Sequence, residues 1–215
     1  MYKIAIFDLD GTLLDTLRDL ADACNYALKI NNYPEHAINE YRYFLGDGTY
    51  KLVERALPED ERTEEKIVSV LNDFNDYYGV HKNDSTKPYD GIINLLDTLK
   101  NSGIKLAVVS NKPHKFAIDI VEKYFKGKFD IIIGKRDNYP AKPDPISVIE
   151  VLNENSCSKE EAIYIGDSNV DMYTGKNAEL YTAGVWCGFR DVEELIIAGA
   201  DKIVTDAKEL LNEII

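Results

Sequence analysis

The sequence contains few cysteines. Its 215 residues include three, Cys24, Cys157 and Cys187, which lie far apart and form no C-x-x-C motif. Disulfide-stabilised secreted domains and cysteine-rich metal sites usually carry closely spaced cysteines in even numbers. The cysteine content therefore favours a reduced protein, and we expect a cytoplasmic location.

Positive charge is also scarce. Lys and Arg total 25 against 38 Asp and Glu, which gives a formal net charge of −13. Such a charge is poorly suited to the phosphate backbone of DNA or RNA, so we expect no nucleic-acid partner. Long-range repulsion would also oppose an anionic substrate. A site for such a substrate must therefore concentrate positive charge locally.

Long apolar runs are missing as well. No segment approaches the roughly 20 apolar residues of a membrane span, and the apolar stretch near the N-terminus is too short for a signal peptide. We therefore expect no membrane partner. The hydrophobic content is nevertheless 45%, which is enough for a sizeable core. The length favours one domain, or one core with an insertion.

The apolar pattern divides the chain into two kinds of segment. Between residues 16 and 81, apolar residues follow helical spacing and no convincing strand is found. Thr16 followed by Asp19 resembles a capping box at the start of this region. Elsewhere, helical segments alternate with short apolar runs, at residues 4–7, 104–109, 129–133, 163–165, 181–185 and 203–204.

Strands that alternate with helices predict a parallel sheet covered on both faces. We therefore predict an α/β fold, with a parallel-sheet Rossmann-like core and a small all-helical cap inserted after the first strand. Residues 1–15 and 82–215 would form the core, and residues 16–81 the cap. Two chain crossings would join the parts and create a cleft with a hinge.

Polar residues follow four of the predicted strands. The opening stretch MYKIAIFDLDGTLLDT ends its apolar run at two carboxylates. The Asp-Gly pair within it is also typical of a hairpin turn. Ligands of open α/β sheets, however, bind beyond the carboxyl ends of the strands. A hairpin does not explain why polar side chains recur at successive strand ends, namely Asp8, Asp10, Ser110, Asn111, Lys142, Asp167 and Asp171.

These segments resemble a known family. FDLDGT, Ser110-Asn111, Lys142-Pro143 and GDSNVD occur in the order of the four motifs of the haloacid dehalogenase superfamily of phosphohydrolases. The stretches RYFLGDGTYKLVERAL and SNKPHK further resemble phosphoglycolate-phosphatase-like members. The resemblance implies a phosphoric monoester hydrolase that acts on a small phosphorylated metabolite, with phosphoglycolate favoured.

Hydrolysis of a phosphate ester needs a nucleophile, a proton for the leaving alkoxide and relief of negative charge. The resemblance and this chemistry together make Asp8 the nucleophile, which forms an aspartyl-phosphate. Asp10 would protonate the leaving oxygen and then activate water. Mg²⁺ prefers hard oxygen ligands. We expect Asp8, the backbone carbonyl of Asp10, and Asp167 to hold it.

The remaining motif residues are expected to bind phosphate. Ser110, Asn111 and Thr12 would contact the phosphoryl oxygens, and Lys142 would neutralise their charge. Asp171 would orient Lys142 or a metal-bound water. Structural alternatives stay open: a helix cap for Ser110, a surface charge for Lys142, a turn for Asp167 and a loop cap for Thr12.

Substrate choice is expected in the helical segment, because the four motifs address only phosphoryl and metal. The loop around Gly46 is the predicted reader, since glycines allow close backbone approach. Arg42 and Lys51, beside that loop, could meet a second anionic group or could be surface charges. A phosphosugar mutase, a pyrophosphatase or a nucleotidase would use the same motifs, and a catalytically silent phospholigand-binding module is the alternative from another class.

Overall fold

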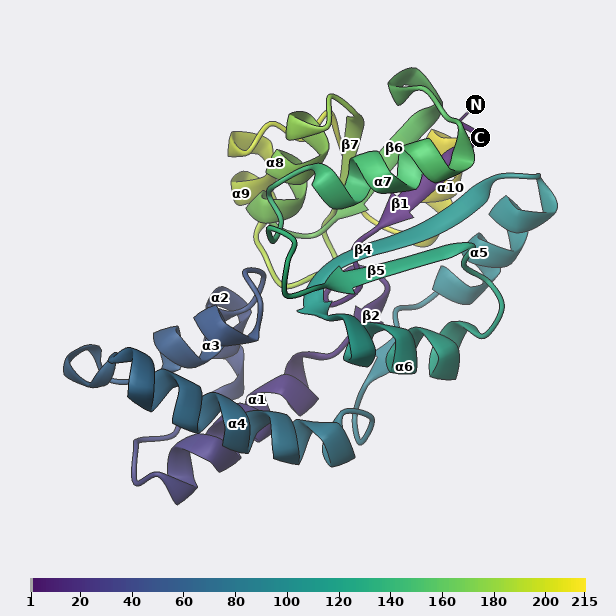
Figure 1. Ribbon diagram of the computed structural model, residues 1–215. Helices are drawn as coiled ribbons and strands as arrows, with labels where there is room; N and C mark the ends of the chain where they lie inside the picture. The colour runs from purple at the N-terminus through teal and green to yellow at the C-terminus, as the bar shows by residue number, and fades with distance from the viewer. Residues whose placement is uncertain (1) are drawn as a thin grey trace.

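The computed structural model describes residues 2–215 and contains a six-stranded parallel sheet with helices on both faces (Figure 1). The strand order is β5-β4-β1-β6-β7-β8. This architecture confirms the predicted fold class. The strands of the sheet are β1 (Ile4–Phe7), β4 (Lys105–Pro113), β5 (Ile131–Lys135), β6 (Ala162–Gly166), β7 (Tyr181–Val185) and β8 (Lys202–Val204).

Strand β1 lies at the centre of the sheet because all four of its residues are apolar and fully buried. It pairs with β4 on one side and with β6 on the other, so that Phe7 is in register with Val108 and Ile165. A parallel strand buried on both faces has no solvent-facing side and therefore shows no polar alternation. These neighbours also exclude a hairpin that begins with β1.

Helices cover the two faces of the sheet. Ala5 and Phe7 share one buried cluster with side chains of three helices, α5 (Ile92–Asn101), α6 (His114–Phe125) and α10 (Ala207–Ile214). Ile4 and Ile6 belong to a separate cluster with α7 (Ile146–Asn155). This alternation is the period of two expected of a strand. Two shorter helices, α8 (Asn169–Asn177) and α9 (Val192–Ile197), pack beside β7 and β8.

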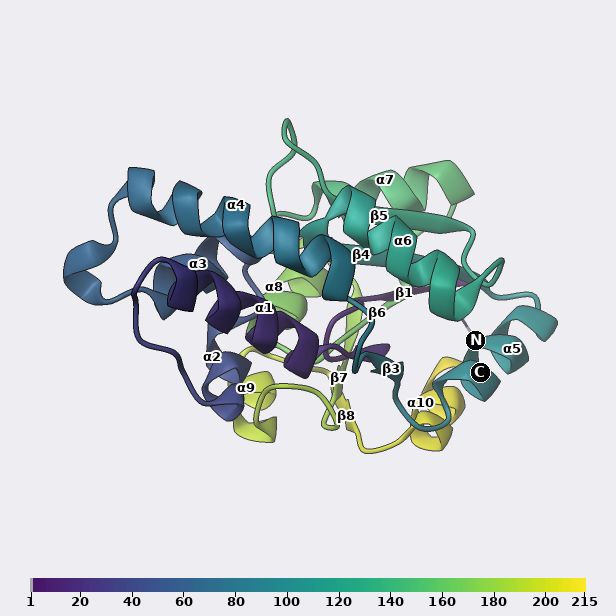
Figure 2. The same ribbon diagram turned by 90° about the horizontal axis from the view of Figure 1, so that it is seen from below.

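Residues 16–81, here called the helical insertion, leave the sheet after β1 and form a separate group of helices (Figure 1). The longest, α4, lies alongside α1, as both views show (Figure 2). Phe74 and Leu28, one from each of these helices, are fully buried. The helices are α1 (Leu17–Ile30), α2 (Tyr41–Phe44), α3 (Thr49–Ala56) and α4 (Glu64–His81).

The two chain segments that connect the helical insertion to the sheet are hydrogen-bonded to each other. Strand β2 (Leu14–Asp15) pairs antiparallel with β3 (Lys87–Pro88). The Asp19 carboxylate accepts hydrogen bonds from Ser85 N at 2.8 Å, Thr86 N at 2.9 Å and Thr86 Oγ1 at 2.7 Å. The predicted capping box is therefore wrong, because Asp19 bonds the second crossing and Thr16 makes no side-chain cap bond.

Strand β4 is longer than the sequence predicted. The apolar run ends at Val109, whereas the strand continues to Pro113, with a register shift against β5 between these two residues. A polar strand end is buried here because the helical insertion covers it. The irregular segment carries Ser110 and the two residues that follow it. Within residues 2–215, no helix is both long enough and apolar enough to cross a membrane.

Candidate active site

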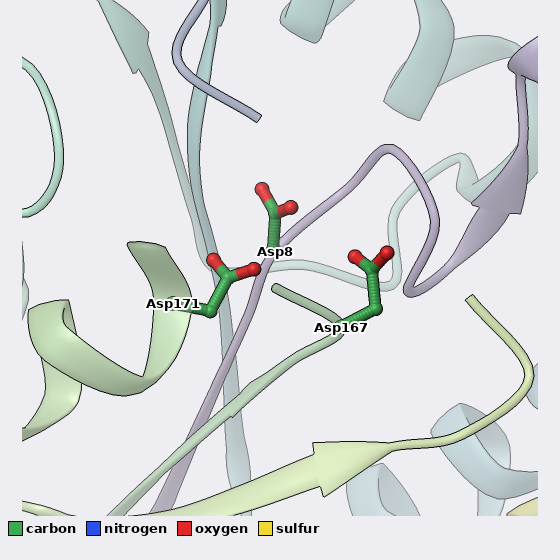
Figure 3. Close-up of side chains that lie close together, drawn as sticks. All are labelled: Asp8, Asp167 and Asp171. Carbon is green, nitrogen blue, oxygen red and sulfur yellow. The ribbon is translucent and has the colours of Figure 1, made fainter. Parts of the chain in front are cut away.

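The carboxyl ends of the adjacent strands β1 and β6 bring three motif carboxylates together. Asp8 follows β1, Asp167 follows β6, and Asp171 lies in the first turn of α8. Figure 3 shows these three side chains on neighbouring segments, with their carboxylates directed to the same side. One oxygen of each lies within 4.8 Å of the others. Lys142 reaches the same point from the loop between β5 and α7.

Lys142 bridges two of the carboxylates. Its Nζ lies 2.8 Å from Asp8 Oδ1 and 2.6 Å from Asp171 Oδ1. The other oxygen of Asp171 accepts hydrogen bonds from Ser168 N at 3.1 Å and Ser168 Oγ at 2.6 Å. Asp171 thus caps helix α8 with one oxygen and holds Lys142 against Asp8 with the other.

Burial disfavours the charged forms of the carboxyl groups in this site. Burial, followed by the charge of Asp171, raises the pKa of Asp8 to about 7, although Lys142 partly opposes the shift. Burial and the charges of Asp171 and Asp8 hold the pKa of Asp167 well above its usual value. Burial by itself lowers the pKa of Lys142, but Asp171 and Asp8 raise it well above normal. Three buried carboxyl groups thus share one ammonium group, and Asp8 and Asp167 keep their protons more readily than exposed carboxyl groups do.

This donor set fits a divalent cation. Asp8 Oδ1 is buried and has no hydrogen-bond partner, its ion pair with Lys142 apart. Asp167 is oriented by Thr12 Oγ1, which donates to Oδ1 at 3.0 Å, and by Phe189 N, which donates to Oδ2 at 2.7 Å. Carboxylates with free lone pairs and unbalanced charge are typical ligands of hard cations. Each oxygen of Asp171 already accepts two contacts, from Lys142 and Tyr164 on Oδ1 and from Ser168 on Oδ2, whereas each oxygen of Asp167 accepts only one. Asp8 and Asp167 therefore keep more free lone pairs for a cation than Asp171 does.

Asp10 has a partner that the sequence analysis did not assign. Lys112 Nζ lies 3.0 Å from Asp10 Oδ1 and 3.0 Å from Oδ2. Burial lowers the pKa of Lys112, but the adjacent Asp10 more than offsets this, and the net shift is upward. Ser110 and Lys112 are two residues apart on a strand, and residues with this spacing share a face. In the stretch SNKP, this spacing from Ser110 is the one feature of the sequence that could have indicated Lys112 as a site residue.

Asn111 connects three segments. Its side-chain amide donates to Gly46 O at 3.0 Å and to Lys142 O at 3.2 Å, and its Oδ1 accepts from Lys142 N at 2.8 Å. Asn111 therefore fixes both the loop that carries Lys142 and the glycine loop of the insertion. Ser110 is buried beside it, and its Oγ accepts from Lys112 N at 3.3 Å.

A small cleft of about 40 Å³ lies between the sheet edge and the helical insertion. The insertion closes it with apolar side chains and glycine backbone. Its lining comprises Asp8, Asp10, Ser110, Asn111, Lys112 and Phe189 from the core, and Leu20, Leu45, Gly46, Gly48, Thr49 and Leu52 from the insertion. A larger cavity of about 300 Å³ lies beside the crossings, and it is lined by Tyr89 and Cys187 among others and by none of the four motif carboxylates.

The two basic residues proposed as substrate contacts lie outside this lining. Arg42 donates to Phe189 O at 2.9 Å and to Gly188 O at 3.0 Å, so it joins the insertion to the core. Lys51 is exposed and pairs with Glu54. The sequence analysis missed Arg190, which makes the reciprocal contact by donating to Leu45 O at 2.8 Å.

Sequence comparison agrees with this geometry. The family model of the haloacid dehalogenase-like hydrolases matches residues 5–185, so the chain belongs to this family. The prediction made from the four motifs is thereby confirmed, as is that of a hydrolase.

Individual relatives match over nearly the whole chain. Phosphoglycolate phosphatase of Vibrio cholerae is 32% identical, across 99% of this chain and 97% of its own. Phosphoglycolate phosphatase of Psychrobacter arcticus is 35% identical, across 90% of this chain and 88% of its own. The crystal structure of a candidate phosphoglycolate phosphatase from Lactobacillus delbrueckii subsp. bulgaricus has a TM-score of 0.95 at 35% identity, covering 100% and 98% of the two chains.

Proposed function

We propose that this protein is a Mg²⁺-dependent phosphatase that hydrolyses a small phosphate monoester through an aspartyl-phosphate at Asp8. The observation that carries the proposal is the separation of two carboxylates in one cleft. Asp8 contacts Lys142, whereas Asp10 contacts Lys112. Two carboxylates in different surroundings can take different roles, one as nucleophile and the other as acid and base.

The reaction takes two steps. An oxygen of Asp8 attacks phosphorus while the bond from phosphorus to the ester oxygen breaks, and Asp10 gives a proton to the departing alcohol. Asp10 then takes a proton from water as that water attacks the aspartyl-phosphate. The products are inorganic phosphate and the regenerated Asp8 carboxylate. Protonation of an alkoxide leaving group typically accelerates its loss by about 10² to 10⁴.

Asp8, the backbone carbonyl of Asp10, and Asp167 would hold the Mg²⁺ ion. When bound, Mg²⁺ offsets negative charge and so permits an anionic carboxylate to meet an anionic phosphoryl group. Lys142 stays beside Asp8 because Asp171 holds it there. Lys142 and Ser110 then supply positive charge and a hydrogen bond to the phosphoryl oxygens. The hydroxyl group of Thr12 donates a hydrogen bond to Asp167 and so keeps the Asp167 carboxylate in position.

The relatives support a small phosphorylated acid as the substrate. Phosphoglycolate is favoured because the relatives that match over most of the chain include phosphoglycolate phosphatases. We also propose that residues 16–81 form a cap domain over a core of residues 1–15 and 82–215. Gly46 would face the substrate through its backbone, since its loop lines the cleft.

The proposal is tested with a set of phosphate esters assayed in the presence of Mg²⁺: phosphoglycolate, pyrophosphate, hexose phosphates and nucleotides. Phosphoglycolate is expected to give the highest kcat/KM. Asp8→Asn should reduce turnover to background while leaving the melting temperature near that of the wild type. Asp137→Asn, an exposed carboxylate, is the matched control. Wild-type kcat in Asp8→Asn would refute the covalent mechanism.

A further inference from the structure

Lys112 is held in an unusual place for a lysine. Its side chain is 2% exposed, and its ammonium group lies equally close to both oxygens of Asp10, at 3.0 Å. Buried charged groups are costly unless they are paired. The pairing with Asp10 explains why the ammonium is tolerated, and it leaves the Asp10 carboxylate with a fixed orientation.

The helical insertion contacts the same ammonium. The ring of Tyr78, from the last turns of α4, has its centroid 4.8 Å from Lys112 Nζ. The ring is itself fixed, because it stacks on Phe74 at 5.4 Å and meets the edge of Phe116 at 5.4 Å. A cation over an aromatic face is attracted to it, more strongly where both are desolvated.

Lys112 differs in function from Lys142. Lys142 lies beside Asp8 and Asp171, where the phosphoryl group is transferred. Lys112 lies beside Asp10, where the alcohol leaves, and its backbone N–H also donates to Ser110 Oγ at 3.3 Å. An Asp side chain that turns freely spends little time directed at the leaving oxygen, and small misplacements of catalytic groups reduce rates strongly.

We propose that Lys112 is a positioning residue for Asp10, that Tyr78 holds Lys112 in place, and that the helical insertion thereby takes part in aligning the acid. The effect of Lys112 on the reaction rate rests on the proposed function, whereas its effect on the orientation of Asp10 does not. Lys112 fixes the carboxyl group of Asp10, and Asp10 moves the proton, to the departing alcohol and then from the attacking water. Lys112 itself exchanges no proton with the substrate.

The kinetic test compares Lys112→Met with the wild type on two esters, 4-nitrophenyl phosphate and an alkyl phosphate such as phosphoglycolate. The ratio kcat/KM includes only steps up to cleavage of the ester bond. Loss of a well-placed acid therefore matters for the alkyl ester and little for the nitrophenyl ester. We expect an additional loss of about 10- to 100-fold for the alkyl ester, as part of what general acid catalysis supplies.

Three further variants make the result specific. Lys112→Arg keeps the charge and should restore most of the alkyl-ester rate. In an Asp10→Asn background, Lys112→Met should cause little further loss, because the two side chains act as one unit. Lys115→Met, an exposed lysine three residues further on, should behave as the wild type. Equal losses for both esters, or additive losses with Asp10→Asn, would overturn the proposal.

A structural measurement separates this inference from the proposed function. In a crystal structure of Lys112→Met, or of Lys112→Gln if the first variant does not fold, the Asp10 carboxylate should be displaced or occupy two conformers. An unchanged Asp10 would refute the positioning role whatever the enzyme's activity. A different pair of results would separate the two roles. Suppose that Asp10 is displaced in the Lys112→Met structure, but that Asp10→Asn lowers kcat/KM equally for both esters. The acid role in the proposed function would then fail, and the positioning role of Lys112 would stand.

Discussion

Replacement of Asp8 by Asn should change how the stability of the protein depends on pH. Burial and the charge of Asp171 raise the pKa of Asp8 from 3.8 to about 7. Between these values the folded protein keeps a proton that the unfolded chain has lost. The folded state then binds more protons, so its stability falls as pH rises through this window. Asn carries no titrating proton and removes this contribution.

The size of the effect follows from the shift in pKa. Each unit of difference between folded and unfolded states corresponds to about 1.4 kcal/mol. A pKa that moves from 3.8 to about 7 therefore corresponds to a few kcal/mol, on the order of 4, lost between acid and mildly alkaline pH. The loss is present in full above the folded pKa and absent below the unfolded one.

The measurement is denaturant unfolding of the wild type and Asp8→Asn at pH 4 and pH 8, with EDTA and at constant ionic strength. Groups distant from Asp8 contribute alike to both proteins and cancel in the difference, whereas Asp167 and Lys142, whose pKa values depend on the charge of Asp8, add to it. Relative to Asp8→Asn, the wild type should lose a few kcal/mol of unfolding free energy on going to pH 8. Mg²⁺ added at pH 8 should stabilise the wild type more than the variant. Parallel pH profiles would refute the assignment of a buried, raised pKa to Asp8.

Three other substitutions have defined outcomes. Asp19→Ala removes the acceptor of three hydrogen bonds at the crossings and should lower the unfolding free energy by about 2–4 kcal/mol, whereas Asp22→Ala on the same helix should change it little. Gly46→Val places a branched residue at φ 109°. A fall in kcat/KM for some esters only, with unchanged Mg²⁺ affinity, would support a specificity loop. An equal fall for all esters that follows the melting temperature would contradict it. Arg42→Ala removes two contacts between insertion and core and should raise KM roughly tenfold, and an unchanged KM would show that these contacts do not stabilise the closed cleft.

The sequence predicted the parts of the site that depend on local pattern. An apolar run marks a buried parallel strand, and the chain direction then places the next polar residue at the sheet edge. Asp8 after β1 and Asp167 after β6 follow directly from this rule. The rule needs only the strands and their common direction, and both are readable from periodicity.

Contacts between distant segments could not be predicted in this way. Lys112 and Asp10 are 102 residues apart, and Asp19 and Thr86 are 67 apart. Local pattern made Asp19 look like a capping residue, because the competing partner enters only when the two crossings meet. The same limitation applies to Arg42, because its side chain is oriented by a hydrogen bond to the distant carbonyl of Gly188 and not by a contact within its own helix.

The negative charge of the chain is compatible with a phosphate ester as substrate because the positive charge is buried where it acts. Lys112 and Lys142 are each shielded from water and each bound to a carboxylate. The site holds four carboxyl groups, Asp8, Asp10, Asp167 and Asp171, against these two lysines, and a divalent cation would offset the negative charge that remains when all four are ionised. Binding then depends on short-range contacts in a dry cleft, where electrostatic interactions are strong, rather than on long-range attraction. A helical insertion that closes over the cleft would create those conditions at the moment the ester is in place.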